Sequence, residues 1–462
     1  MLTKFKKKYI GNWEFYRRYL LLAIPMILQN AITNLVSFLD NIMVGQLGTE
    51  QMSGVAIVNQ LIFVYNLAIF GAVSAASIFG AQYFGKGNHK GHMYSFRFKL
   101  YATLLVTGGA ILLFLTKGSA LISLYLTDTV GNGATDLALQ YGLEYLAIMM
   151  VGLIPFAVNQ SYATNIKETG QTFIPMLASF VAVGTNAILD YLMIFGIGPF
   201  PELGVQGAAL ATVIARYIEA LIVVIWAHIH RGKNRYLEGA YTGFGIPLAE
   251  LKAILIKGFP LMMNEVLWAA GMTTVTQCYS VRGLDVVAGL NIASTITNLF
   301  NIVYLQLGSC ISIVVGQYLG AGKLEDAKDA DNKMIVFSVF CCVIMAALMF
   351  VVGGFFPGIY NTTEEIRELA TSFIAVSAII MPFCAFSHAS YFTLRSGGKT
   401  VVTFLFDSVF TWVIVVPAAY LLAHFTGLGI VGIYFLVQGT ELIKVIIGYL
   451  MVKSNVWVVQ MV

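Results

Sequence analysis

Long apolar segments, each separated from the next by a short polar one, follow one another along the whole chain. Most of these segments cover roughly 20 residues or more, the length that an α-helix needs to cross a hydrocarbon layer about 30 Å thick. Glycine, proline and charged residues mark the turns between them. The pattern predicts twelve membrane-spanning helices, with approximate spans 16–44, 54–83, 97–115, 137–164, 172–196, 204–228, 253–279, 286–318, 334–356, 366–393, 400–422 and 429–452.

The first half of the chain matches the second half when it is shifted by 235 positions without a gap. This register places Pro25 on Pro260, and both prolines predict a helix bend that can serve as a hinge in gating. A repeat of this length in an apolar chain is typical of two similar lobes that face a shared cavity, a design used for transport. The sequence therefore predicts an all-α polytopic membrane protein with two six-helix lobes related by a pseudo-twofold axis. We expect an N-lobe over 1–230, a cytoplasmic linker over 231–252 and a C-lobe over 253–462.

Composition and charge agree with a membrane location. Hydrophobic residues make up 58% of the 462 residues and charged residues 11%, against about 25% in a soluble chain. Most lysines and arginines fall in alternate polar segments, beginning with the N-terminal one, and only Lys117, Arg282 and Arg367 fall in the others. Because basic residues near helix ends stay on the cytoplasmic side, we expect a multi-pass protein of the cell membrane with both termini in the cytoplasm. The net charge of +4 follows from this topology, and we expect no nucleic-acid partner.

The sequence offers little for catalysis or cofactor binding. The segment 396–400 resembles the end of a phosphate-binding loop, but Thr393 stands where that loop requires glycine. No Ser/His, Cys/His or two-histidine arrangement is recognisable in a membrane-facing pocket. We therefore expect a protein that is not an enzyme and has no cofactor. Active transport would then draw on an ion gradient, unless a separate subunit supplies ATP hydrolysis.

Acidic residues inside the apolar segments are rare, since a carboxylate at the bilayer centre costs about 2.5–3.5 kcal/mol. Asp40 lies in the first span, and Asn186 and Asp190 lie one turn apart on one face of the fifth. A carboxylate sheltered there can carry a proton or, with amide and carbonyl oxygens nearby, bind Na⁺. We predict that Asp40, Asn186 and Asp190 form a site for the coupling ion, H⁺ or Na⁺. The alternative is that both acids are solvated at the outer ends of their helices.

The second copy of the repeat carries its acids at different places, Glu265 in the seventh span and Asp407 in the eleventh. The gap-free register pairs Glu265 with Asn30, so the scaffold residues repeat while the acids do not. This broken symmetry predicts separate tasks for the two lobes, with Glu265 and Asp407 binding the substrate or a second cation. Asp407 follows a cytoplasmic turn closely, and the alternative for it is an interfacial position.

Two pairs of opposite charges have i, i+3 spacing within the apolar segments, Arg216 with Glu219 and Glu441 with Lys444. Burying a lone charge costs far more than burying a pair. The spacing therefore predicts structural ion pairs inside the helix bundle, with gating contacts as the alternative.

Several short motifs occur together along the chain. They are Ile24-Pro25, Asp40-Asn41-Ile42-Met43-Val44-Gly45, Gly80-Ala81-Gln82-Tyr83-Phe84-Gly85, Asn186 with Asp190, Gly204-Val205-Gln206-Gly207-Ala208-Ala209 and Gly316-Gln317-Tyr318-Leu319-Gly320-Ala321-Gly322. As a set they resemble the multidrug and toxic compound extrusion (MATE) transporters of the bacterial type, over essentially the whole chain. The resemblance implies a V-shaped central cavity between two lobes and efflux of organic compounds in exchange for H⁺ or Na⁺ by alternating access. It also implies the first-lobe ion site, the bend at Pro25 and the second-lobe acid Glu265, whereas Asp407 matches no family position securely.

A lipid-linked oligosaccharide flippase of the same superfamily is the alternative function. Such proteins usually have more helices and a more cationic cavity that meets phosphate. The acidic candidates in this chain favour cationic, amphipathic cargo. We expect a monomer in the lipid bilayer whose small-molecule partners are organic cations or drugs.

Overall fold

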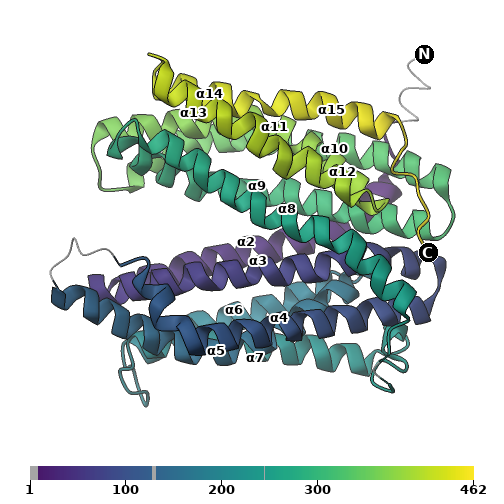
Figure 1. The fold of residues 1–462 in the computed structure, drawn as a ribbon, viewed down its shortest axis with the longest axis horizontal. Helices are drawn as coiled ribbons and strands as arrows, with labels where there is room; N and C mark the ends of the chain where they lie inside the picture. Colours follow the sequence, from purple (N-terminus) through teal and green to yellow (C-terminus); the bar gives the residue numbers. More distant parts are fainter. Residues whose placement is uncertain (1–8, 127–131, 244) are drawn as a thin grey trace. The chain divides into compact units, whose positions relative to one another are not determined.

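The computed structural model describes residues 9–126, 132–243 and 245–462. Over these residues the protein is helical without a strand, and twelve of the described helical stretches are long and apolar enough to cross a membrane. The predicted all-α fold with twelve spans is thereby confirmed. The elements in chain order are α2 (Trp13–Gly45), α3 (Thr49–Lys86), α4 (His89–Ser123), α5 (Asn132–Glu168), α6 (Phe173–Ile194), α7 (Val205–Ile229), η1 (Arg235–Leu237), α8 (Leu248–Ser280), α9 (Leu284–Gly320), α10 (Leu324–Gly353), η2 (Phe356–Ile359), α11 (Glu364–Ser396), α12 (Thr400–Phe404), η3 (Leu405–Val409), η4 (Thr411–Val415), α13 (Val416–Phe425), α14 (Ile430–Gly439) and α15 (Glu441–Lys453). Figure 1 labels the α-helices.

The last two spans are irregular helices. The eleventh, Thr400–Phe425, passes from α12 through two π-helical segments, η3 and η4, into α13. The twelfth, Ile430–Lys453, consists of α14 and α15, which are separated at Thr440. Hydropathy predicts that a segment crosses the membrane, but it carries no information on the hydrogen-bond register of the backbone.

The helices are grouped into two compact units. The N-unit comprises Leu28–Gly80 and His89–Lys252, and the C-unit comprises Met1–Ile27, Ala81–Asn88 and Ala253–Val462. Helices α2 and α3 therefore contribute to both units, and the units differ from the predicted lobes in where residues 1–27 and 81–88 belong. The predicted lobe boundaries themselves stay a prediction.

In the N-unit, α7 packs against α5 and α6, and α4 packs against α5. Helices α3 and α5 approach so closely that a Cβ atom on Gly54 would lie 2.5 Å from the carbonyl oxygen of Ala138. The other face of α4 carries large apolar side chains with no protein cover, of which Leu105 is 79% exposed. A bundle that is apolar outside as well as inside is suited to a lipid environment.

The segment after α7, predicted as a linker, is held to α4 by one buried arginine. Arg97 donates hydrogen bonds to the carbonyl oxygens of Ala240 at 2.8 Å, Gly245 at 2.7 Å and Gly239 at 2.6 Å. The ring of Tyr236 in η1 is buried in the same place. Five fixed N–H donors let one arginine satisfy several carbonyl groups at once, so the segment is a packed part of the N-unit.

In the C-unit, α11 is the central helix and packs against α9, α10, α14 and α15. The short piece of α3 that belongs to this unit packs on the end of α9 by two reciprocal contacts. A Cβ atom on Gly85 would overlap the backbone of Gln317, and one on Gly320 would overlap the backbone of Gln82. The shift of 235 positions places Gln82 on Gln317 and Gly85 on Gly320, so the repeat relates the two contacts to each other.

Candidate ion and substrate sites

The three residues predicted as the ion site come together in the N-unit. Asp40 lies near the end of α2, while Asn186 and Asp190 lie one turn apart on α6. The carboxyl group of Asp190 is 1% exposed and lies against the carboxyl group of Asp40 and the amide of Asn186. The alternative of two solvated helix ends does not describe Asp190, because its side chain is buried.

Three of the four carboxylate oxygens of this pair have no hydrogen-bond donor among the described residues. They are both oxygen atoms of Asp190 and the Oδ1 atom of Asp40, and all three are buried. None of the ion pairs in the described part of the chain includes either residue. The amide of Asn186 instead donates to the hydroxyl of Thr212, at 3.4 Å.

Two adjacent carboxylates repel each other, and the repulsion is strong where water is excluded. A proton shared between the two groups removes one of the charges, as in other carboxyl pairs. A bound Na⁺ would act in the same way, with the carboxylate oxygens and the Asn186 carbonyl as hard oxygen ligands. The arrangement therefore suits a small cation that is bound and released.

Tyr145 lies in the electrostatic field of both carboxyl groups and of Arg216, and Tyr65 lies in that of Arg216. The hydroxyl of Tyr145 donates to Asn59 at 3.3 Å, and the hydroxyl of Tyr65 donates to the carbonyl of Leu153 at 3.0 Å. Arg216 on α7 reaches into the same region, where its guanidinium group stands 5.1 Å from the centre of the Phe156 ring. Sequence reasoning missed the tyrosines, because an isolated tyrosine in an apolar helix gives no signal of its partners.

The predicted ion pair between Arg216 and Glu219 is wrong. Within the described residues no direct ion pair joins them, and Glu219 instead accepts a hydrogen bond from the hydroxyl of Ser179 on α6. Gln29 donates to the same hydroxyl at 2.7 Å. The i, i+3 spacing allows a contact, but each side chain has a partner on a neighbouring helix instead, Glu219 at Ser179 on α6 and Arg216 at the carbonyl of Gly152 on α5, at 3.4 Å.

In the C-unit, the predicted pair Glu441 with Lys444 is likewise wrong. The Lys444 ammonium forms its ion pair with Asp407, at 2.9 Å, and the Oε1 atom of Glu441 is buried with no hydrogen-bond donor in the described part of the chain. The second oxygen of Asp407 accepts a hydrogen bond from the amide of Asn264 at 3.1 Å. Asp407 thus already has a cationic partner, which a cargo cation would have to displace.

Asp407 lies in the π-helical segment η3, where the backbone bulges outward. Asn264 holds this segment in place, since its Oδ1 atom accepts from the backbone N–H and the hydroxyl of Ser408, at 3.2 and 2.8 Å. Helices with a π-bulge often carry functional residues at that point. No feature of the sequence revealed the bulge or the role of Asn264.

Glu265 follows Asn264 on α8 and is partly buried. It lies in the electrostatic field of Arg395 on α11 and of Asp407, and no ion pair among the described residues includes it. The structure thus places Glu265 and Asp407 in one neighbourhood. Their role in substrate or cation binding stays a prediction.

Pro25 and Pro260 lie inside α2 and α8, and neither proline ends its helix. Pro25 stands two residues before the point at which α2 passes from the C-unit to the N-unit. Each proline removes one backbone hydrogen bond, which makes the helix easier to bend at that point. The hinge role of both residues stays a prediction.

Comparison with known proteins identifies relatives of the whole chain. The sequence profile of the MatE family matches residues 25–192 and 260–421. A probable multidrug resistance protein NorM of Thermotoga maritima is 23% identical over 421 residues, which cover 91% of this chain and 88% of that protein. A protein of the same description from Halalkalibacterium halodurans is 24% identical over 413 residues, with 89% and 88% covered.

Solved structures share the fold. A transporter of the MOP superfamily from Pyrococcus furiosus superposes with a TM-score of 0.85 at 20% identity, covering 95% of both chains. A MATE crystal structure in the bent conformation superposes with the same score and identity, covering 96% of this chain and 95% of the other. Because the family profile covers both copies of the repeat and the fold agrees over nearly the full length, the chain belongs to the MatE family, the multidrug and toxic compound extrusion transporters.

Proposed function

We propose that this chain is a secondary active multidrug efflux transporter of the plasma membrane, which exports organic, cationic and amphipathic compounds in exchange for H⁺ or Na⁺. Multidrug resistance proteins among its relatives and the family membership support the efflux. The observation that carries ion coupling is the pair of adjacent carboxyl groups, Asp40 and Asp190, which have no cationic partner among the described residues.

The mechanism follows from the electrostatics of that pair. In the empty state a buried carboxylate, Asp190, and a half-buried one, Asp40, lie side by side, which is unfavourable, so the site draws in a proton or Na⁺ when it is accessible. The loaded site is neutral or nearly so, and burial then costs less. Occupancy by the ion therefore favours one conformation and release favours the other, as alternating access requires.

The bend in α2 connects ion binding to conformation in this proposal. Asp40 lies on the N-unit part of α2, and Pro25 lies near the residue at which the helix changes unit. A change in the position of Asp40 can then be taken up at a point where the helix already lacks one hydrogen bond.

Organic cations are the proposed cargo because one acidic side chain of the C-unit stands outside the ion pairs of the described residues. Glu265 in the C-unit is a partly buried carboxylate that the described ion pairs leave out. Lys444 already neutralises Asp407, at 2.9 Å. A cationic substrate would be attracted to Glu265, while Asp407 holds α15 in place through its ion pair with Lys444.

The experiment uses purified protein in liposomes with an imposed proton or sodium gradient and measures the movement of ethidium. We expect dye movement that depends on one of the two gradients and that Asp190→Asn and Asp40→Asn abolish. Asp136→Asn, which alters an exposed carboxylate on α5, is the matched control and should transport normally. Dye movement that ignores both gradients would refute antiport, and scrambling of a labelled lipid-linked sugar without dye movement would favour the flippase.

A further inference from the structure

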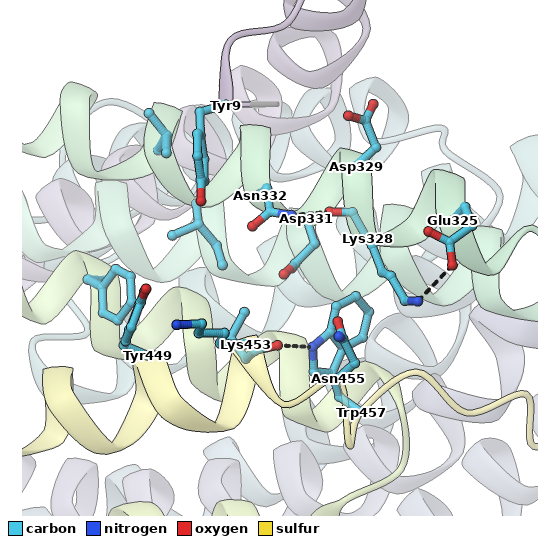
Figure 2. A pocket seen from close by; sticks show the side chains of 14 residues that line it. Tyr9, Glu325, Lys328, Asp329, Asp331, Asn332, Tyr449, Lys453, Asn455 and Trp457 are labelled. Atoms are coloured by element: carbon cyan, nitrogen blue, oxygen red, sulfur yellow. Dashed lines mark hydrogen bonds and ion pairs between the residues drawn. The ribbon is translucent and has the colours of Figure 1, made fainter. Parts of the chain in front are cut away.

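A cavity of about 480 Å³ lies in the C-unit between α10, α15 and the chain after α15. Figure 2 shows it from close by, with Asp331 on α10 facing Lys453 and Trp457. Its size falls within the range of about 300–1,000 Å³ that is typical of small-molecule sites. Neither the carboxyl pair of the N-unit nor the Asp407 site contributes a residue to its lining.

Two ion pairs account for three of the charged groups around the cavity, because Lys328 pairs with Glu325 at 2.7 Å and Asp329 pairs with Lys333. Lys453 takes part in no ion pair of the described residues and stands 5.4 Å from the ring centre of Tyr449.

Asp331 differs from these charged side chains because it is fully buried. It is 0% exposed, and although its Oδ1 atom accepts a hydrogen bond from the hydroxyl of Thr393, its Oδ2 atom has no partner among the described residues. A buried carboxylate oxygen without a donor is costly, and a donor that enters the cavity would remove this cost.

Aromatic side chains form much of the remaining wall. Tyr9, Phe386, Tyr449 and Trp457 all line the cavity. The indole of Trp457 is fixed, because its N–H group donates to the carbonyl of Val452 at 3.1 Å. Such a wall favours an aromatic group, and aromatic faces also attract cations.

The fold itself does not require an acid at this position. The gap-free register of the repeat pairs Asp331 with Phe96, whose ring packs edge-on against Tyr162 with the centres 4.9 Å apart. In the first copy, the same place on the scaffold is filled by an apolar contact. The shared scaffold therefore does not account for the carboxylate of the second copy, of which one oxygen is used in the hydrogen bond from Thr393.

We propose that this cavity binds an arylalkyl ammonium ion, whose N–H group donates to Oδ2 of Asp331 and whose aryl group lies against Tyr449 and Trp457. A primary or secondary ammonium supplies both the missing donor and the opposite charge. The site is separate from the carboxyl pair of the N-unit and does not depend on the proposed efflux.

The test uses protein labelled with 5-fluorotryptophan and follows the ¹⁹F resonance of Trp457, which the Trp457→Phe variant assigns. The chain has five tryptophans, so the remaining four resonances serve as internal controls. We expect 2-phenylethylamine to shift the Trp457 resonance saturably. Its N,N,N-trimethyl derivative, which keeps the charge but has no N–H donor, and 3-phenylpropanoate, which carries the opposite charge, should bind more weakly.

Two variants test the role of the carboxylate. We expect Asp331→Asn to weaken binding of 2-phenylethylamine by about tenfold or more, the effect of losing one ionic hydrogen bond. Asp329→Asn, at a carboxylate of the same cavity that is already paired, should change it by less than about threefold. Wild-type affinity in Asp331→Asn, or equal binding of the amine and the anion to the wild-type protein, would overturn the proposal. The ligand comparison needs no substitution, so it decides the question even if Asp331→Asn does not fold.

Discussion

The ion pair between Asp407 and Lys444 should show an asymmetric response to removal of its two partners. The atoms lie 2.9 Å apart, and the two side chains are only 17% and 9% exposed. Replacing Lys444 by Met leaves a buried carboxylate that keeps only the amide hydrogen bond from Asn264. Removing one partner of a buried pair costs about 3–5 kcal/mol, and we expect Lys444→Met to fall in this range.

The converse change should cost less, because the ammonium group keeps other partners. In Asp407→Asn, Lys444 still stands 5.7 Å from the ring centre of Phe406 and 5.6 Å from that of Phe410. Each contact of this kind contributes about 0.5–2 kcal/mol. We therefore expect Asp407→Asn to cost about 1–3 kcal/mol less than Lys444→Met.

A double-mutant cycle completes this test. The assay is the free energy of unfolding in mixed micelles of dodecyl sulfate and a mild detergent. We expect the double variant to recover most of the loss, because it removes both charges of the pair together. Glu325→Gln, which breaks the more exposed pair with Lys328, is the control and should cost less than about 1 kcal/mol. A loss below about 1 kcal/mol in Lys444→Met, or a double variant that loses the sum of both singles, would refute the reasoning.

Three further predictions follow from particular contacts. Gly320→Ala places a methyl group against the backbone of Gln82 and should lower the free energy of unfolding by about 1–3 kcal/mol. Gly109→Ala, whose methyl group meets open space, is the control and should not lower it, and thermal unfolding compares the two variants. Arg97→Lys keeps the charge but loses the guanidinium N–H groups that hold the segment after α7. Trypsin should therefore cut within 231–243 faster than in the wild type, and an unchanged rate would contradict this. Pro25→Ala restores a backbone hydrogen bond in α2 and should slow gradient-driven dye efflux while leaving dye binding within about threefold; unchanged efflux would exclude the hinge.

The sequence predicted the fold because membrane insertion imposes strong and simple constraints. Every span must be apolar and about 20 residues long, so twelve apolar segments indicate twelve helices. Rarity of intramembrane acids also drew attention to Asp40 and Asp190, which the structure places side by side. The number of spans thus follows from the composition of the segments, and the candidate acids follow from the free-energy cost of a carboxylate inside the membrane.

Partner choice could not be predicted in the same way. Lys444 has Glu441 one turn away in sequence, yet it pairs with Asp407, which the chain brings from another helix. The π-helical segment that presents Asp407 is a matter of backbone register, and Asn264, which holds it, is an ordinary amide in an apolar helix. These features depend on tertiary contacts that a local pattern does not encode.

The most direct test of ion coupling measures the ion itself. Proteoliposomes without an imposed gradient receive an organic-cation substrate on one side, and the flux of H⁺ and of Na⁺ is followed together with that of the substrate. We expect the wild-type protein to move one of the two ions in the opposite direction, in proportion to the substrate, and Asp190→Asn to move neither. Substrate flux with no opposing ion in the wild type, or undiminished ion flux in Asp190→Asn, would contradict a carboxyl pair that couples transport.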